Sequence, residues 1–193
     1  MTPEEGLEYL KEGNARFVAG TPKHHDVPAN VRRTATGQYP FAAILSCMDS
    51  RGPVELMFDL TVGDAFSLRL AGNVVNADVL GSLEFATKIA GTELVLVLGH
   101  TRCGAVKGAI DGVVLGSLTG LLARISPAVR AAGAGSSEDD AYLERVAERN
   151  VRLSMRELQD KSPVLRELIT SGSVRLAGAI YDIVTGKVRF LPD

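Results

Sequence analysis

The sequence predicts an α/β fold with a mainly parallel β-sheet flanked by helices. Two apolar runs, Phe41–Leu45 and Leu94–Leu98, are typical of buried strands. Segments with helical patterning follow both runs, and strands that alternate with helices at this spacing indicate parallel βαβ units. The 193 residues, 46% of them hydrophobic and 23% charged, suffice to bury one substantial core. We therefore expect a single domain over residues 1–193.

The N-terminal segment, residues 1–40, is expected to form a helix followed by an extended arm. Thr2 is a suitable N-cap, Pro3 occupies the first helical position, and Glu5 completes a capping box. This helix should run to about Val18, and residues 21–40, with three prolines, should be extended. Such a helix and arm in front of a core are suited to wrapping a neighbouring subunit.

The sheet core is predicted over residues 41–115, and residues 116–193 add helices and a terminal hairpin. The core alternates strands and helices in the order strand 41–46, helix 54–60, strand 65–70, helix 78–90 capped by Asp78, strand 93–98 and a helix from Gly104. The last part contains helices at 117–131 and 138–158, a short helix from Ser162, and strands 174–182 and 187–191 joined by a tight turn.

Charge and hydropathy exclude several classes of partner. A formal net charge of −2 argues against nucleic-acid binding, which needs a clustered basic excess. No apolar run approaches the roughly 18 residues needed to cross a bilayer. The acidic start of the chain lacks the basic-then-apolar order of a secretory signal. We expect a cytoplasmic protein without nucleic-acid or membrane partners.

The two cysteines lie in short motifs that each follow a predicted strand. Cys47 begins Cys-Met-Asp-Ser-Arg, and Cys103 ends His-Thr-Arg-Cys, which starts at His100. Parallel strands of one sheet would bring both motifs to its carboxyl edge, where open α/β sheets bind ligands. Taken singly, a residue such as Cys47, His100 or Cys103 at a strand end is more often structural than a metal ligand. Together they supply three ligands for a tetrahedral Zn²⁺ and leave one position for water.

Asp49 and Arg51 add acid–base chemistry to the first motif. Asp49 is two residues after Cys47 and can point at the same ion or at its water. Arg51 can hold that carboxylate through a charge-assisted, bidentate pair. The alternative is a turn aspartate beside a surface arginine.

With these motifs the chain resembles a β-class carbonic anhydrase. The family's Cys-x-Asp-x-Arg and His-x-x-Cys-Gly windows correspond to Cys47–Arg51 and His100–Gly104. Further matching stretches are Gly63–Phe66, Arg69–Asn73, Ser82–Ala86 and the isolated Gln38. Leu70 and Phe85 depart from the usual Asn and Tyr. The resemblance covers about residues 1–115 motif by motif and the remainder in general layout.

The resemblance implies four parallel strands plus an edge strand, and a zinc enzyme that hydrates carbon dioxide reversibly to bicarbonate with a zinc-bound hydroxide. Cys47, His100 and Cys103 would hold zinc, while Asp49 and Arg51 would be catalytic. It also implies a homodimer or a dimer of dimers, with the pocket at the dimer interface. The implied substrate-binding residues are Gln38, Phe66, Ala71, Phe85 and Gly104.

The resemblance also bears on the state of the metal. Some members hold an inactive form in which the aspartate binds zinc, and they carry a tryptophan three residues before the first cysteine. Ile44 occupies that position here, and the chain has no tryptophan. We therefore expect Asp49 to be a fourth ligand only in a closed state, and the open form to prevail.

Other functions remain open from the sequence. A hydrolase of carbon disulfide or carbonyl sulfide with the same fold would keep every ligand. A non-catalytic zinc-stabilised protein would require a fourth protein ligand. A nucleotide-binding domain is disfavoured because no Gly-x-Gly-x-x-Gly follows a strand, and thiol redox catalysis because no Cys-x-x-Cys occurs.

Overall fold

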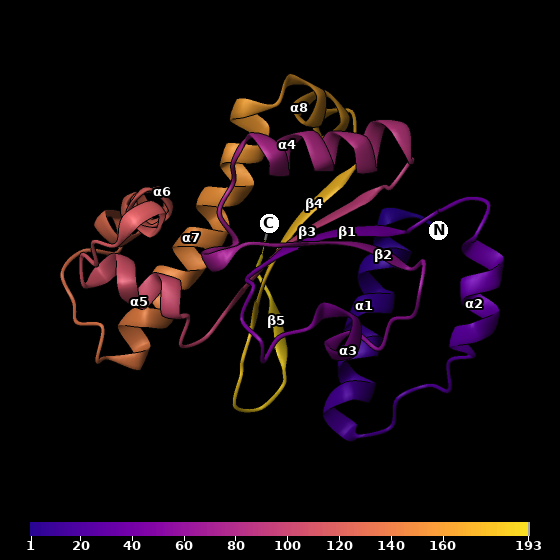
Figure 1. The fold of residues 1–193 in the computed structure, drawn as a ribbon, viewed down its shortest axis with the longest axis horizontal. Coiled ribbons are helices and arrows are strands. Elements are labelled where there is room, and N and C mark those ends of the chain that lie inside the picture. Colours follow the sequence, from indigo (N-terminus) through magenta and orange to yellow (C-terminus); the bar gives the residue numbers. More distant parts are fainter. Residues whose placement is uncertain (193) are drawn as a thin grey trace.

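The computed structural model describes residues 1–192 and contains a five-stranded sheet in the order β2-β1-β3-β4-β5 (Figure 1). The strands are β1 Ala42–Ser46, β2 Ala65–Arg69, β3 Leu94–His100, β4 Arg175–Tyr181 and β5 Val188–Phe190. The first four are parallel, and β5 runs antiparallel to β4 at one edge. The predicted fold class is confirmed.

Helices cover both faces of this sheet. They are α1 Pro3–Ala19, α2 Val27–Thr34, α3 Val54–Met57, α4 Ala77–Glu84, α5 Gly104–Ile110, α6 Gly116–Ala132, α7 Asp140–Lys161 and α8 Pro163–Thr170, with a 3₁₀ turn η1 at Ala71–Asn73 and a π turn η2 at Phe85–Ile89. Alternate residues of β1 enter two separate cores. Ala43 and Leu45 join the core under α4, α6, α7 and α8, whereas Ala42 and Ile44 join the core under α1 and α3. Burial on both faces explains why β1 and β3 are almost continuously apolar.

The N-terminal helix forms as its capping residues predict. The Thr2 hydroxyl accepts a hydrogen bond from the Glu5 backbone N–H, and the Glu5 carboxylate accepts one from the Thr2 N–H. The helix ends at Gly20, which adopts a left-handed conformation with φ +68°. Its buried residues include Leu7 and Leu10, which pack on the sheet.

Two details of the predicted elements are wrong. Residues 27–34 of the supposedly extended arm form α2, because the Asp26 side chain accepts a hydrogen bond from the Ala29 N–H and Pro28 is tolerated in the first turn. The cap of α4 is Asn76 rather than Asp78, since the Asn76 side chain accepts from the Val79 N–H at 2.8 Å. None of the residues of α2 is buried.

A buried carboxylate ties the arm to the core. Asp59 is only 4% exposed, and its oxygens accept hydrogen bonds from Arg16 Nε at 2.5 Å, from the Lys23 backbone N–H at 3.1 Å and from His25 Nε2 at 3.1 Å. Burial alone would raise the pKa of Asp59, but the donors from Arg16, Lys23 and His25 outweigh it and lower the pKa. The carboxylate therefore stays charged and links three segments.

The pairing of β1 with β3 brings the two sequence motifs together. Ser46 pairs with Leu98, so Cys47 leaves β1 at the level where β3 approaches its last residue, His100. Both motifs lie at the carboxyl edge of the sheet.

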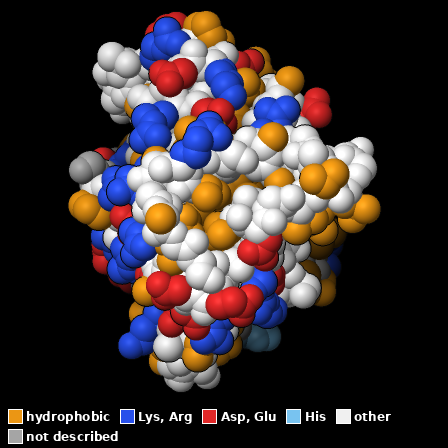
Figure 2. Space-filling view, turned by 90° about the vertical axis from the view of Figure 1, so that its left-hand side faces the viewer, with side chains coloured by type: hydrophobic (Ala, Val, Ile, Leu, Met, Phe, Trp, Pro, Cys, Tyr) orange, Lys and Arg blue, Asp and Glu red, His pale blue; other side chains and the backbone are white. Residues whose placement is uncertain are grey.

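The side of the molecule that carries α5, α6 and α7 has a mixed surface (Figure 2). Apolar side chains lie there among basic and acidic ones. The exposed apolar residues between α5 and α6 are Val113, Val114 and Leu115. In residues 1–192 no helix has the length and apolar character needed to cross a membrane.

Candidate metal centre

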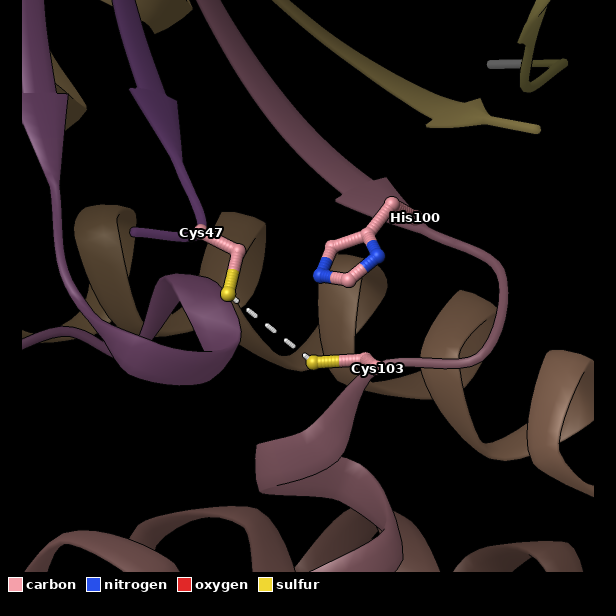
Figure 3. Close-up of side chains that lie close together, drawn as sticks. All are labelled: Cys47, His100 and Cys103. Atoms are coloured by element: carbon pink, nitrogen blue, oxygen red, sulfur yellow. Dashed lines mark hydrogen bonds between the residues drawn. The ribbon is translucent and has the colours of Figure 1, made fainter. Parts of the chain in front are cut away.

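Cys47, His100 and Cys103 converge as the sequence predicts. All three are buried, and their candidate ligand atoms lie within 4.8 Å of one another. Figure 3 shows the two sulfurs and the imidazole pointing into one shared space, from the end of β1, the end of β3 and the start of α5. The sulfurs are 3.9 Å apart. Two thiolates bound to one tetrahedral zinc at about 2.3 Å would be about 3.8 Å apart, so the observed spacing suits a shared ion.

The imidazole of His100 is prepared to act as a ligand. Its Nδ1 lies 2.9 Å from the Thr101 carbonyl oxygen, which can only accept, so Nδ1 carries the proton. Its Nε2 is buried and has no hydrogen-bond partner among the described residues. An unpaired buried nitrogen is costly in a folded protein. A metal ion between this nitrogen and the two sulfurs would satisfy it, so the residues present fit zinc.

The surroundings of the two sulfurs favour a thiolate at Cys47 and oppose a second one at Cys103. A hydrogen bond from the Cys103 thiol lowers the pKa of Cys47, and the Gly72 N–H also donates to the Cys47 sulfur at 3.3 Å. The pKa of Cys103 is raised by the same contact with Cys47 and by burial. Two adjacent thiolates repel each other, and a divalent cation between them removes that repulsion.

Asp49 is held beside the three candidate ligands by Arg51. The guanidinium donates from Nε to Oδ1 at 2.8 Å and from Nη2 to Oδ2 at 2.7 Å, and the Arg51 backbone N–H donates to Oδ1 at 3.0 Å. These bonds, chiefly the side-chain pair, lower the pKa of Asp49 far below its usual range. Asp49 Oδ2 is 3.9 Å from His100 Nε2. An ionised carboxylate thus faces the candidate metal site, and Arg51 donates to both of its oxygens.

Arg69 supports the loop that carries these groups. From the end of β2 its Nε donates to the Cys47 carbonyl at 3.2 Å, and its Nη2 donates to the Asp49 carbonyl at 2.5 Å. Arg69 lies in one of the stretches that match the family pattern, but no role is predicted for it from the sequence. Its position at the end of β2, where it pairs with Ser46 directly before Cys47, is the signal that could have revealed it.

A small cavity opens beside Asp49 and the candidate ligands Cys47 and His100. Its volume of about 10 Å³ is comparable to the space one water molecule requires. Residues that sequence reasoning missed, such as Met57 and Tyr181, also form its wall. The lining residues are Ser46, Cys47, Asp49, Gly52, Met57, Leu98, Gly99, His100, Tyr181 and Ile183.

The five predicted substrate-binding residues lie outside the wall of this cavity. Phe66 and Phe85 form an edge-to-face pair, with ring centroids 6.2 Å apart, along a separate hollow between β2 and α4. Ala71 lies in η1 next to Gly72, and Gly104 begins α5 directly after Cys103.

Gln38 is placed at the other edge of the sheet. It precedes the start of β1 by four residues, whereas Cys47 follows the end of β1. A five-residue strand spans about 17 Å, so the Gln38 side chain cannot reach the candidate metal site of its own chain.

Comparison with known proteins agrees with this geometry. A family model described as carbonic anhydrase matches residues 42–188, which include all three candidate ligands. The chain belongs to the β-class carbonic anhydrase family. This carbonic anhydrase is 36% identical over 191 residues to carbonic anhydrase 2 of Mycobacterium tuberculosis, covering 96% of this chain and 91% of the relative. It is 34% identical to a carbonic anhydrase of Mycolicibacterium smegmatis, covering 97% and 92% of the two chains.

Solved structures support the same assignment. A β-carbonic anhydrase of the fungus Aspergillus fumigatus superimposes with a TM-score of 0.76 at 28% identity, covering 97% of this chain and 89% of the other. A tetrameric β-carbonic anhydrase of Sordaria macrospora also gives a TM-score of 0.76, at 24% identity and 98% coverage of both chains, and shows the shared fold.

Proposed function

We propose that this enzyme converts carbon dioxide and water reversibly to bicarbonate and a proton, using a zinc ion held by Cys47, His100 and Cys103. The observation that carries the proposal is the convergence of three buried donor atoms, one of them the unpartnered Nε2 of His100. Among the described residues this metal-competent group has three members. A purely structural zinc site would normally have four protein ligands, so three ligands support an open catalytic position.

The zinc ion would act as a Lewis acid and lower the pKa of a water molecule to a value near neutrality. Asp49 would accept a hydrogen bond from the attacking water and aim its lone pair at the carbon of carbon dioxide. Arg51 keeps the Asp49 carboxylate ionised and fixed through the bonds at 2.7 and 2.8 Å. Because those bonds occupy both oxygens, they also oppose direct binding of Asp49 to the metal and support the open form.

The resemblance supplies the proposed substrate-binding residues, which lie outside the wall of the small cavity within one chain. Phe66, Phe85 and Ala71 would provide apolar surface for a linear, uncharged molecule, and the Gly104 N–H would stabilise negative charge on the reacting oxygen. Gln38 would donate to a substrate oxygen.

The position of Gln38 favours an oligomer. Since Gln38 cannot reach the metal site of its own chain, only a second copy of the chain can deliver it. We therefore propose a homodimer or a dimer of dimers in which the N-terminal segment crosses to the partner. The related Sordaria macrospora enzymes are tetrameric.

The decisive test combines metal analysis with stopped-flow hydration of carbon dioxide. The wild-type protein should contain about one zinc ion per chain and hydrate carbon dioxide, and Cys47→Ser should lose both properties because a neutral hydroxyl replaces a thiolate ligand. A correctly folded wild-type protein that holds zinc but does not hydrate carbon dioxide would overturn the proposal. Parallel assays with carbonyl sulfide and carbon disulfide would identify the alternative substrates.

A further inference from the structure

The turn η1 touches the sulfur of Cys47 through a backbone group. The Gly72 N–H donates to Cys47 Sγ at 3.3 Å. Gly72 has φ +67°, and a Cβ at this position would lie 2.5 Å from Ile125 Cδ1. Glycine is therefore strongly favoured at this position, because a side chain would add strain at this φ and crowd Ile125.

Helix α7 holds the same turn from the other side. Asn150 Nδ2 donates to the Gly72 carbonyl at 2.7 Å, and Ser154 Oγ donates to the Asn73 carbonyl at 3.0 Å. Asn150 and Ser154 are four residues apart, so they lie on one face of α7, and they are 1% and 2% exposed. Polar side chains buried to this degree are costly unless they are hydrogen-bonded. Here their donors are directed at the turn that contacts a metal ligand.

We propose that Asn150 and Ser154 are positioning residues for the metal centre, acting through η1 on the Cys47 thiolate. This inference rests on the proposed zinc site. The hydrogen bond from Asn150 to the Gly72 carbonyl restricts movement of η1. It thereby keeps the Gly72 N–H directed at the Cys47 sulfur. A ligand held in place by a hydrogen bond binds a metal more tightly, and loss of such outer partners typically weakens metal binding about 10- to 100-fold.

The competing explanation is that Asn150 only stabilises the fold. Asn14 provides a matched control, because it is also a buried asparagine on a helix that hydrogen-bonds backbone groups. Its Nδ2 donates to the carbonyls of Met57 at 3.1 Å and Gly186 at 2.9 Å, and it lies on α1, on the opposite face of the sheet from η1. Replacing either asparagine by leucine removes the donors at nearly constant volume.

The test compares Asn150→Leu and Asn14→Leu by three measurements. These are zinc affinity from competition with a chelator, the thiolate-to-cobalt absorption band of the Co²⁺-loaded protein, and the free energy of unfolding in urea. Asn150→Leu should bind zinc about 10- to 100-fold more weakly than the wild type and shift the cobalt band. Asn14→Leu should lose stability while its zinc affinity and cobalt band match those of the wild type.

Equal zinc affinity and an unchanged cobalt band in Asn150→Leu would overturn the inference. If Asn150→Leu does not fold, Ser154→Ala replaces it, since it removes only one hydrogen bond, and it should weaken zinc binding and shift the band in the same direction. An unchanged affinity and band in Ser154→Ala would then overturn the inference. A wild-type protein that fails to bind zinc would refute the proposed function as well, whereas normal wild-type binding with unaffected variants would refute only the positioning role.

Discussion

Replacing Arg51 by methionine isolates the contribution of its guanidinium to catalysis. The change keeps most of the aliphatic stem and removes the two donors at 2.7 and 2.8 Å from the Asp49 oxygens. The backbone N–H of residue 51 still donates to Oδ1. Asp49 would therefore stay in the loop but lose the bidentate contact that fixes its carboxylate plane.

The size of the effect follows from the exposure of the pair. Hydrogen bonds to charged groups contribute about 1.5–3 kcal/mol each when buried, whereas exposed ion pairs contribute about 0.2–1 kcal/mol. The Asp49 side chain is 18% exposed and the Arg51 side chain 50% exposed, so the pair lies between these limits. A loss of about 1–2 kcal/mol corresponds to a decrease in kcat/KM of about 5- to 30-fold.

The pH dependence separates loss of orientation from loss of charge. Arg51 lowers the pKa of Asp49, so its removal raises that pKa toward the ordinary value of about 3.9. Asp49 then remains ionised from pH 6 to 9 in both proteins, and the ratio of mutant to wild-type kcat/KM should be constant over this range. The assay is stopped-flow hydration of carbon dioxide with equal zinc content in both proteins.

Arg102→Met is the matched control. Arg102 lies in the second motif but pairs with the exposed Asp140, so its loss should leave kcat/KM unchanged. The reasoning is refuted if Arg51→Met retains full activity. It is also refuted if the mutant regains wild-type activity as the pH rises from 6 to 8, because protonation of Asp49 would then be the cause.

Three further predictions concern the metal, the arm and the turn. Removing the metal with a chelator should abolish hydration and lower Tm, and added zinc should restore both, because the ion binds the folded chain. Asp59→Asn should destabilise the protein by about 2 kcal/mol in urea at pH 7. Folding lowers the pKa of Asp59, so the ionised carboxylate stabilises the fold fully at pH values above the pKa of Asp59 in the unfolded chain. This stabilisation is lost as the pH falls through the pKa of Asp59 in the folded protein. The difference in unfolding free energy between the wild type and Asp59→Asn should therefore shrink below about pH 4. Gly72→Ala should destabilise the fold by about 1–3 kcal/mol through strain at φ +67° and should weaken zinc binding, as measured by chelator competition. The first prediction is contradicted by full activity without metal, and the second by a loss of stability in Asp59→Asn that grows in acid. The third is contradicted by wild-type zinc affinity in Gly72→Ala.

The candidate metal ligands could be predicted because their convergence depends on strand position. Cys47 and His100 follow or end strands whose apolar character is visible in the sequence, and parallel pairing then brings them to one edge. Asp49 and Arg51 are two residues apart, so their contact is also local. Residues that act through neighbouring positions in the chain or through one simple strand pairing are accessible to sequence reasoning.

Other features depend on packing that the sequence does not display. Prolines suggested an extended arm, yet the Asp26 cap was sufficient to begin α2. The helix around Asn150 was expected, but nothing in the sequence shows that its amide meets Gly72, 78 residues away. The contact between Arg69 and the carbonyls of Cys47 and Asp49 likewise requires the register of β2 against β1.

The distance along the chain between Cys47 and Cys103 would affect when the proposed zinc ion can be bound. The two sulfurs are 56 residues apart in sequence, and joining the ends of a flexible segment of that length costs about 3.6 kcal/mol in entropy before any constant term. A chain emerging from the ribosome should therefore have a low affinity for the cation until β3 has been synthesised and has paired with β1. Because the ion would bind only the docked strands, it would stabilise that pairing by mass action, and scarcity of metal during synthesis should raise the population of chains whose sheet is open at that edge.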